Sequence, residues 1–284
     1  MKRLLLSGAL TLAAATSGLL PLPAGAKAPL PIRAYLGFDR NDYPGDASLR
    51  LLRRSFAYSG YWLNPPPGAK SNTWTGKRRK LEAAGFGFLV LFNGRRYSEI
   101  RANGDAAKLG ASDARVAEAA ARREGFAHGT VIFLDQEEGG RLLPEQRAYL
   151  LAWVDGVDAA GFRAGVYCSG MPAQEGSSSV VTAQDIRQNA AGRRIVYWVS
   201  NDACPPSPGC AFPRRPPAPA ASGVDFAEIW QFAQSPRRKA VAASCPANYS
   251  PDGNCYPPGI HPAQKLQVDL DTATSPDPSH GRRK

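Results

Sequence analysis

The sequence has little histidine and lacks the short motifs that mark the commonest catalytic centres. His128, His261 and His280 are its three histidines, and no two of them have the H-x-x-H or H-E-x-x-H spacing of a zinc site. We therefore interpret His128 and His261 as loop or surface residues and predict no metal site. The chain also lacks a G-x-S-x-G elbow, a G-x-G-x-x-G turn and a P-loop. Serine hydrolysis and a nucleotide cofactor are therefore disfavoured, and we predict no cofactor.

Long apolar runs are lacking too, apart from one at the N-terminus. Residues 1–3 (Met-Lys-Arg) are positively charged, residues 4–20 are mostly apolar, and residues 24–26 (Ala-Gly-Ala) form an A-x-A cleavage signal. This pattern predicts a secretory signal peptide over residues 1–26, and a mature chain that starts near Lys27. The run is too short and too weakly apolar to predict stable membrane insertion. We expect a secreted protein, periplasmic or associated with the cell wall.

Acidic residues are in the minority. The chain has 24 Asp and Glu against 35 Lys and Arg, a formal net charge of +11 at pH 7. A basic exported protein favours polyanionic surroundings, such as cell-wall polymers, acidic glycans or anionic membrane surfaces. Because no basic helix or platform of aromatic residues and arginine stands out, nucleic acid is not a predicted partner. We expect the chain to act as a monomer.

The five cysteines suggest disulfides, because exported proteins meet oxidising conditions. Cys204 and Cys210 close a short proline-rich loop, and Cys245 and Cys255 bracket a turn-forming segment. Pairing within each loop needs the least chain rearrangement, so it predicts the bridges Cys204–Cys210 and Cys245–Cys255. Cys168 lies in an apolar strand pattern and is interpreted as a small buried side chain.

Strand patterns alternate with helical patterns along most of the chain. The predicted strands are 34–39, 56–63, 86–92, 130–135, 163–168, 194–199, 226–232 and 265–270, with helices over 46–54, 75–84, 113–124, 144–160 and 182–191. Eight strands over about 250 residues predict a single (β/α)8 TIM-barrel-like α/β domain over 27–272. Its last helices are degenerate, since 201–223 and 233–262 show little helical pattern. A doubly wound open sheet is the alternative, and residues 273–284 are predicted to be a disordered basic tail.

Residues 129–140 combine a buried strand pattern with a pair of carboxyl groups and a pair of glycines. An apolar run at 130–134, typical of a strand buried on both faces, leads directly into Asp135 and Glu137. Side chains two residues apart on a strand point to the same side, about 6–7 Å apart. Two carboxyl groups held in this way suit acid–base chemistry on a polar substrate. The alternative is a strand end that exposes its acids to water.

Acids and aromatic residues recur at the predicted ends of the strands. In a (β/α)8 barrel the functional groups lie at these ends. Aromatic faces stack on sugars and paired carboxyl groups cleave glycosidic bonds, so the pattern favours a carbohydrate cleft. The strand-end residues are Asp39, Tyr61, Trp62, Asn93, Asp135, Glu137, Tyr167, Trp198, Trp230, Gln231, Asp269 and Asp271.

Five short motifs around these strand-end residues, taken in order along the chain, resemble those of the family 25 glycoside hydrolases, which are lysozyme-type muramidases. They are Gly37-Phe-Asp39, Asp135-Gln-Glu137, Gly165-Val-Tyr167, Ile229-Trp-Gln-Phe232 and Val268-Asp-Leu270. The chain is still more similar to a group of exported glycoside-hydrolase-like proteins called "domain of unknown function 1906", which shares the start Phe38 to Gly45. The resemblance covers residues 33–272. It implies a barrel with a cleft for peptidoglycan or another amino-sugar glycan.

The resemblance also implies roles for individual residues. Glu137 would be the general acid, with a raised pKa, and Asp135 would orient the 2-acetamido group of the substrate or act as nucleophile. Asp39 and Asp269 would complete an acidic floor that holds sugar hydroxyls. The subsite residues would be Tyr167, Trp198 and Trp230, and the strand-end pattern adds Tyr61, Asn93 and Gln231. Residues 138–140 and the two cysteine loops depart from the lysozyme pattern.

Two functions follow from this pattern. One is a glycoside hydrolase that acts on peptidoglycan or a related amino-sugar glycan. The other is a non-catalytic glycan-binding module on the same scaffold, because a fold alone does not guarantee turnover. Replacing Glu137 by glutamine separates them: it abolishes turnover in the first case and leaves affinity intact in the second.

Overall fold

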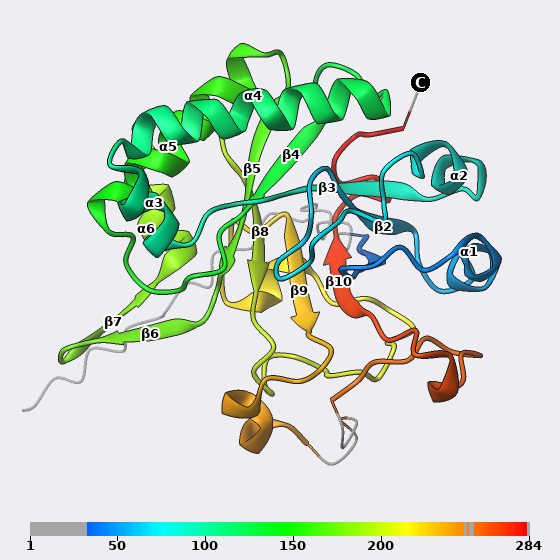
Figure 1. The fold of residues 1–284 in the computed structure, drawn as a ribbon. Helices are drawn as coiled ribbons and strands as arrows, with labels where there is room; N and C mark the ends of the chain where they lie inside the picture. Colours follow the sequence, from blue (N-terminus) through cyan, green and yellow to red (C-terminus); the bar gives the residue numbers. More distant parts are fainter. Residues whose placement is uncertain (1–32, 247–248, 250–252, 283–284) are drawn as a thin grey trace, which may run out of the picture. The chain divides into compact units, whose positions relative to one another are not determined.

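The strands close into a barrel. The computed structural model describes residues 33–246, 249 and 253–282, so the predicted signal peptide lies outside the described part. In this part eight strands form a closed barrel in the order β1-β10-β9-β8-β5-β4-β3-β2 (Figure 1). Closure confirms the predicted barrel and excludes the open sheet. The strands are β1 Tyr35–Asp39, β2 Tyr58–Trp62, β3 Gly87–Asn93, β4 Val131–Asp135, β5 Arg163–Ser169, β8 Val196–Ser200, β9 Ile229–Ala233 and β10 Asp269–Ala273.

Helices lie on the outside of the barrel, and the two longest, α4 and α5, run side by side (Figure 1). The helices are α1 Asp46–Leu52, α2 Arg78–Ala83, α3 Tyr97–Asn103, α4 Ala106–Glu124, α5 Pro144–Ala159 and α6 Thr182–Gln188. Helix α4 begins earlier than predicted, because the side chain of Asp105 caps it by accepting from the backbone N–H of Lys108. The sequence patterns missed α3 and the hairpin of β6 (Pro172–Glu175) and β7 (Ser178–Val181). Among the described residues, no helix is long and apolar enough to cross a membrane.

The last strand runs in the opposite direction to the others. Strands β1, β2, β3, β4, β5, β8 and β9 pair in parallel, whereas β10 is antiparallel to both β1 and β9. Figure 1 shows the arrows of β9 and β10 pointing opposite ways. The strand predicted over 265–270 is found at Asp269–Ala273. A (β/α)8 barrel implies eight parallel strands, and that expectation is wrong for β10. A parallel return needs a long crossover, usually a helix, and the described part of the β9–β10 connection contains only short 3₁₀ turns.

The degenerate last helices are confirmed. Between β8 and β9 the chain forms only the 3₁₀ helix η1 (Pro219–Ser222). Between β9 and β10 the described residues form η2 (Lys239–Ser244) and η3 (Pro262–Gln264).

Two glycines make room for aromatic rings inside the barrel. A Cβ atom on Gly37 would lie 2.0 Å from the ring of Tyr58, and one on Gly165 would lie 2.5 Å from the ring of Phe133. A side chain at either position would collide with a ring that is itself fully buried. The glycines of Gly37-Phe-Asp39 and Gly165-Val-Tyr167 thus have a packing role beneath the strand-end acids and aromatics.

The C-terminal segment is ordered as far as it is described, so the prediction of a disordered tail over 273–284 is wrong for residues 273–282. Ala273 belongs to β10. The side chain of Ser279 is fully buried, accepts from the backbone N–H of Val90 at 2.8 Å, and its backbone carbonyl accepts from Val131. Arg282 donates to the carbonyl of Phe86 at 2.8 Å. The segment satisfies backbone groups at the start of β3 and β4, which local composition does not reveal. Residues 283–284 lie outside the described part.

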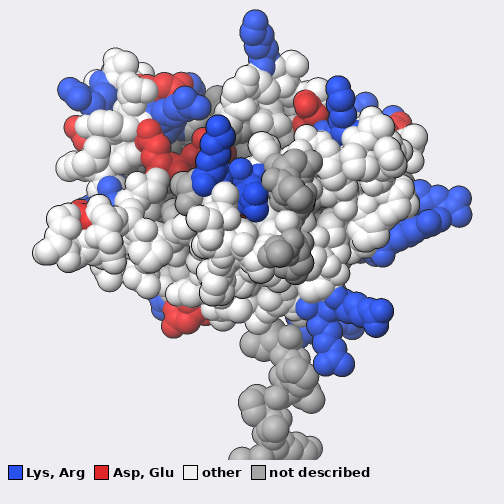
Figure 2. Space-filling view, turned by 90° about the horizontal axis from the view of Figure 1, so that it is seen from below, with Lys and Arg blue, Asp and Glu red and all other residues white. Residues whose placement is uncertain are grey.

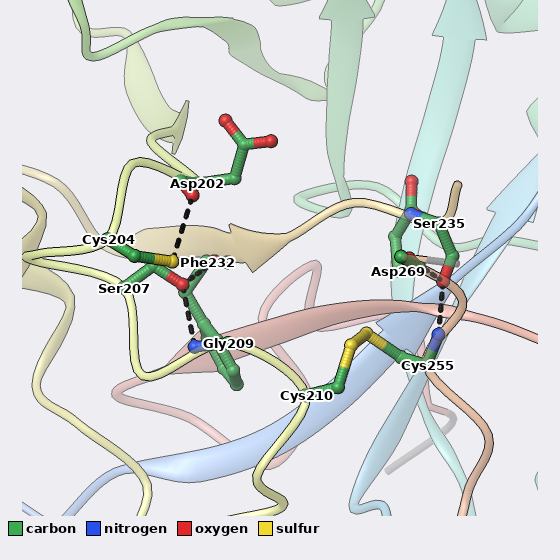
Figure 3. Close-up of a disulfide and its surroundings, with 10 residues drawn as sticks. Asp202, Cys204, Ser207, Gly209, Cys210, Phe232, Ser235, Cys255 and Asp269 are labelled. Atoms are coloured by element: carbon green, nitrogen blue, oxygen red, sulfur yellow. Dashed lines mark hydrogen bonds between the residues drawn. A yellow bond between two sulfur atoms is a disulfide. The ribbon is translucent and has the colours of Figure 1, made fainter. Parts of the chain in front are cut away.

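The disulfide also differs from the prediction. Cys210 is bonded to Cys255, across 45 residues of sequence, whereas Cys204 and Cys245 are thiols (Figure 3). The predicted pairs Cys204–Cys210 and Cys245–Cys255 are therefore wrong. Each predicted pair lies within one loop, and the fold instead brings the two loops together. Cys168 is fully buried in β5, as predicted.

Candidate functional site

A cleft of about 380 Å³ opens at the end of the barrel where the parallel strands end. Because β10 is antiparallel, its first residue lies at this end, where Asp269 pairs with Asp39 of β1. The cleft therefore gathers most of the predicted site. Of the predicted residues it is lined by Asp39, Asp135, Glu137, Tyr167, Trp198, Gln231 and Asp269. Figure 2 views the molecule from below Figure 1, the side toward which β9 points, and shows acidic side chains adjoining basic ones on this face.

Two predicted subsite residues point away from the cleft. Tyr61 is fully buried and donates its hydroxyl to Glu124 of α4 at 2.5 Å. Trp230 is fully buried and donates its indole N–H to the carbonyl of Asn201 at 2.9 Å. Their neighbours Trp62 and Gln231 line the cleft instead. Successive side chains of a strand face opposite sides, so each strand end offers only one of the two. Neither Tyr61 nor Trp230 lines the cleft, so their predicted role in substrate binding has no support from its geometry.

Asn93 lies beside a second cleft. Its backbone N–H donates to the Asn64 side chain at 2.7 Å and its side chain donates to the carbonyl of Pro65 at 2.9 Å, so it fixes the proline-rich loop after β2. The second cleft, of about 650 Å³, is bounded by this loop and residues 93–96. Asp135 and Glu137 line both clefts. The carboxyl pair thus stands where the two hollows adjoin.

Gln231 connects the acids of the first cleft. Its amide N–H₂ donates to Asp39 at 2.9 Å and to Asp269 at 3.3 Å. Its amide oxygen accepts from the hydroxyl of Tyr167 at 2.7 Å and from Gln234 at 2.9 Å. Because both ends of the amide are bonded, the side chain is held in one orientation. Gln231 therefore positions two carboxyl groups and a tyrosine relative to one another.

A further aspartate lies beneath the cleft. Asp271 is fully buried, accepts from the indole N–H of Trp198 at 3.1 Å and lies close enough to Asp39 for the two carboxyl groups to influence each other's pKa. Burial raises the pKa of Asp39 to about 6, against the hydrogen bonds from Gln231 and Asp271. Burial, and next the charge of Asp39, raise the pKa of both Asp269 and Asp271 well above the ordinary range. These carboxyl groups carry protons at a pH where exposed aspartates are ionised.

The carboxyl pair after β4 splits into a buried and an exposed member. Asp135 is 6% exposed, and burial, followed by the charges of Glu137 and Asp39, raises its pKa well above the ordinary range. Its Oδ1 atom is buried without a hydrogen-bond partner. Glu137 is exposed rather than enclosed by apolar side chains. The neighbouring Glu138 has a structural role, since it accepts from the backbone N–H of Tyr97 and the side chain of Gln146.

Arg40 is a cation at the edge of the acidic floor. It lines the first cleft, and its Nε and Nη1 atoms are buried without a hydrogen-bond partner in the part of the chain that the structure describes. Burial lowers the pKa of its guanidinium, while the charges of Asp42 and Asp269 oppose this shift. In turn, the charge of Arg40 partly offsets the rise in the pKa of Asp269. Because Arg40 forms no ion pair with any described residue, its guanidinium acts on these acids at a distance.

Several lining residues were not predicted as site residues. Arg40 directly follows the predicted site residue Asp39, and Gln234 directly follows the observed strand β9, two residues beyond the predicted strand 226–232. The alternation of polar Gln231 with apolar Trp230 and Phe232 was a usable signal for β9. Within the described residues, no cluster of three or more His, Cys, Asp or Glu side chains could hold a metal ion. The arrangement can protonate, hydrogen-bond and stack on a polar ligand. The unpredicted lining residues include Arg40, Asn41, Asp42, Pro67, Gln234, Ser235 and Gln267, whereas Trp62 was named as a strand-end residue without a subsite role.

Comparison with solved structures shows proteins of the same fold. An uncharacterised protein from B. stearothermophilus is 21% identical, with 84% of this chain and 95% of that chain covered and a TM-score of 0.50. The Tat-secreted protein Rv2525c of Mycobacterium tuberculosis, in complex with L-tartrate, is 14% identical, with 86% and 97% covered and a TM-score of 0.50. A lysozyme from Streptomyces coelicolor is a weaker match, 11% identical, with 85% and 92% covered and a TM-score of 0.48. At such identities the likeness shows the fold alone.

Sequence comparison shows the family. No curated protein sequence matches the chain. A family model described as "Rv2525c-like, glycoside hydrolase-like domain" matches residues 59–210, which span β2 to the loop after β8. The resemblance drawn from the strand-end motifs is thereby confirmed. Because this match covers more than half of the sequence, the chain belongs to the family of Rv2525c-like glycoside hydrolase-like domains.

Proposed function

We propose that the first cleft binds a cell-wall amino-sugar glycan, such as peptidoglycan, and hydrolyses its glycosidic bonds. The observation that carries the proposal is the convergence of Asp39, Asp135, Glu137 and Asp269 in one cleft. Aromatic side chains of Trp62, Tyr167 and Trp198 line the same cleft, and the partly exposed Tyr167 is the one that can contact a sugar ring without rearrangement. A carboxyl pair next to stacking surfaces is the equipment that glycoside cleavage requires.

Glu137 is the proposed general acid. It is exposed and lines both clefts, so a glycan lying from one to the other brings a glycosidic oxygen within its reach. A bound sugar ring would cover its carboxyl group and remove water from it, which favours the protonated form that an acid catalyst needs.

Asp135 has the proposed role of orienting the substrate. A nucleophile must be ionised, whereas burial favours the neutral form of Asp135. A neutral carboxyl group can donate a hydrogen bond to an acetamido oxygen and accept one from its N–H. Of the two roles that the family resemblance implies for Asp135, orientation of the acetamido group therefore fits its environment better.

A non-catalytic glycan-binding module is the second candidate function. The exposure of Glu137 favours it, because an apolar enclosure is the usual means of keeping a carboxyl group protonated. In a binding module the aromatic side chains and the hydrogen-bonded Asp39–Gln231–Asp269 group would hold the sugar, and Glu137 would contribute little.

The proposed setting is outside the cytoplasm. The basic composition, with a net charge of +11, suits a protein that works against anionic wall polymers. The signal pattern at residues 1–26 provides the route of export. A monomer is sufficient for the proposed activity, because the cleft is built from one chain.

The test is release of soluble fragments from purified peptidoglycan by the mature chain, residues 27–284, with new reducing ends measured. Glu137→Gln is compared with Glu138→Gln, a matched change whose partners Tyr97 and Gln146 are donors that an amide oxygen still satisfies. A hydrolase predicts release by the wild type and Glu138→Gln, and a loss of at least about a hundredfold in Glu137→Gln. Absence of release, with equal co-sedimentation of all three proteins with peptidoglycan, contradicts hydrolysis and supports the binding module.

A further inference from the structure

Two loops, whose described residues form only 3₁₀ helices, are joined along one side of the cleft end of the barrel. The first follows β8 and the second follows β9. Arg238 of the second loop forms an ion pair with the buried Asp202 of the first, with Nε 3.1 Å from Oδ2. The Cys210–Cys255 disulfide joins the same loops further along (Figure 3). The loops are therefore fixed to each other at two separate points.

The two remaining cysteines of these loops lie between those points. Cys204 is 1% exposed, and its backbone N–H donates to the side chain of Ser244 at 3.1 Å. Cys245 is the residue after Ser244, at the end of η2, and it is partly exposed. Burial, followed by hydrogen bonding with Cys245, raises the pKa of the Cys204 thiol to about 12.

We propose that Cys204 and Cys245 form a second disulfide in the mature protein, beside the Cys210–Cys255 bridge. The backbone N–H of Cys204 is hydrogen-bonded to Ser244, the residue next to Cys245, so the two cysteines face each other across the loops and bond formation requires little movement of either loop. By contrast, Cys168 lies on β5 in the barrel wall, away from both loops, and stays a thiol. All four loop cysteines are then paired between the loops.

The proposed reaction is thiol–disulfide exchange with an oxidant that carries a disulfide, such as a dithiol–disulfide oxidase or oxidised glutathione. Cys245 is the accessible thiol, so its thiolate attacks the oxidant and releases one thiolate from it. Cys204 then loses its proton and attacks the sulfur of Cys245, which releases the second thiolate. The protein loses two electrons and two protons, and the oxidant gains them as two thiols.

The second bridge would close a ring that supports the cleft. The ring runs through residues 204–210 and 245–255 and is completed by the two disulfides. Cys255 also donates its backbone N–H to the side chain of Ser235, and the backbone N–H of Ser235 donates to Asp269 (Figure 3). The ring thus reaches an acid of the cleft through two hydrogen bonds. This role does not depend on whether the cleft binds a glycan or cleaves it.

The test begins with the mature wild-type chain after oxidation by glutathione disulfide. It is denatured without reductant, alkylated with N-ethylmaleimide, digested and examined by mass spectrometry. The proposal predicts linked peptides for Cys204–Cys245 and Cys210–Cys255, with alkylation only at Cys168. Recovery of both Cys204 and Cys245 in alkylated form, beside an intact Cys210–Cys255 bridge, overturns it. So does a bridge within either loop.

A second measurement compares unfolding with and without reductant. Wild type is compared with the double variant Cys204→Ser/Cys245→Ser, which keeps the Cys210–Cys255 bridge. Reduction should raise the unfolding equilibrium constant of both proteins. The increase in the wild type should exceed the increase in the double variant by a factor on the order of a hundred, which is the contribution of the second bridge. Equal effects of reduction in the two proteins overturn the proposal.

Discussion

Replacing Asp39 by asparagine should change how the stability of the protein depends on pH. The Asp39 side chain is 6% exposed, and burial raises its pKa from the ordinary value of 3.8 to about 6. The folded protein therefore holds this proton more tightly than the unfolded chain does. Its contribution to stability is fully present below pH 3.8 and is lost as the pH rises through about 6.

The size of the effect follows from the shift in pKa. Each pKa unit corresponds to about 1.4 kcal/mol, so the shift of Asp39 amounts to about 3 kcal/mol over the whole window. Between pH 4 and pH 7 most of this, about 2–3 kcal/mol, should be lost from the free energy of unfolding of the wild type. An asparagine does not ionise, and its amide keeps the size of the carboxyl group. Removing the charge also lets Asp269 and Asp271 ionise more easily.

The assay is urea unfolding of the mature chain at pH 4, 5, 6 and 7. The free-energy difference between Asp39→Asn and wild type should move in favour of the variant by about 2–3 kcal/mol from pH 4 to pH 7. Asp42→Asn is the control, because Asp42 is an exposed aspartate three residues further on, and its difference from wild type should stay nearly constant. A constant difference for Asp39→Asn would show that the carboxyl group is ionised in the folded protein throughout, and would refute the reasoning.

Two further predictions concern Tyr61, whose side chain points away from the cleft, and Ser279, which lies in the C-terminal segment that was predicted to be disordered. Tyr61→Phe removes a hydrogen bond to a carboxylate of α4, so the free energy of unfolding should fall by about 1–2 kcal/mol, while co-sedimentation with peptidoglycan should not change. Trp62→Phe should weaken co-sedimentation, because Trp62 lines the cleft. Weaker co-sedimentation of Tyr61→Phe and unchanged co-sedimentation of Trp62→Phe would contradict the assigned orientations. Ser279→Ala leaves the backbone N–H of Val90 without its buried acceptor and should cost about 1–3 kcal/mol in urea unfolding, whereas the exposed change Thr274→Ala should be nearly neutral; equal, small effects would mean that the C-terminal segment does not support the barrel.

The barrel could be predicted because most strands carry their own signal. Residues 130–134 form an apolar run that only a strand covered on both faces can accommodate, and β4 occupies Val131–Asp135. The direction of the last strand has no such signal, because a strand has the same residue pattern whichever way it runs. That direction depends on the preceding connection. Asp269 was nevertheless predicted at the correct end of the barrel, since an early residue of an antiparallel strand and a late residue of a parallel one meet at the same edge.

Successive side chains of a strand face opposite sides, and the candidate site could be predicted only where the sequence indicates which of two neighbours faces the cleft. At Tyr61 and Trp62 both neighbours are aromatic, so their chemistry does not say which faces the cleft. At Trp230 and Gln231 the polar residue is the one inside, because the end of this barrel is filled by carboxyl groups rather than by apolar side chains. The pairing of Cys210 with Cys255 depends on two loops that are distant in sequence and that meet only in the folded chain.

The buried acids themselves indicate that the cleft is maintained for a ligand. Asp39, Asp135, Asp269 and Asp271 are held where burial opposes their ionisation, and each lowers the stability of the fold as the pH rises. Apolar side chains of similar volume would fill this end of the barrel without that cost. A group that destabilises the protein is retained when its removal harms function. Asp39→Asn should therefore stabilise the folded chain at pH 7 and weaken its binding to peptidoglycan in the same experiment, whereas a variant that gains stability and keeps full binding would mean that the acids serve no ligand.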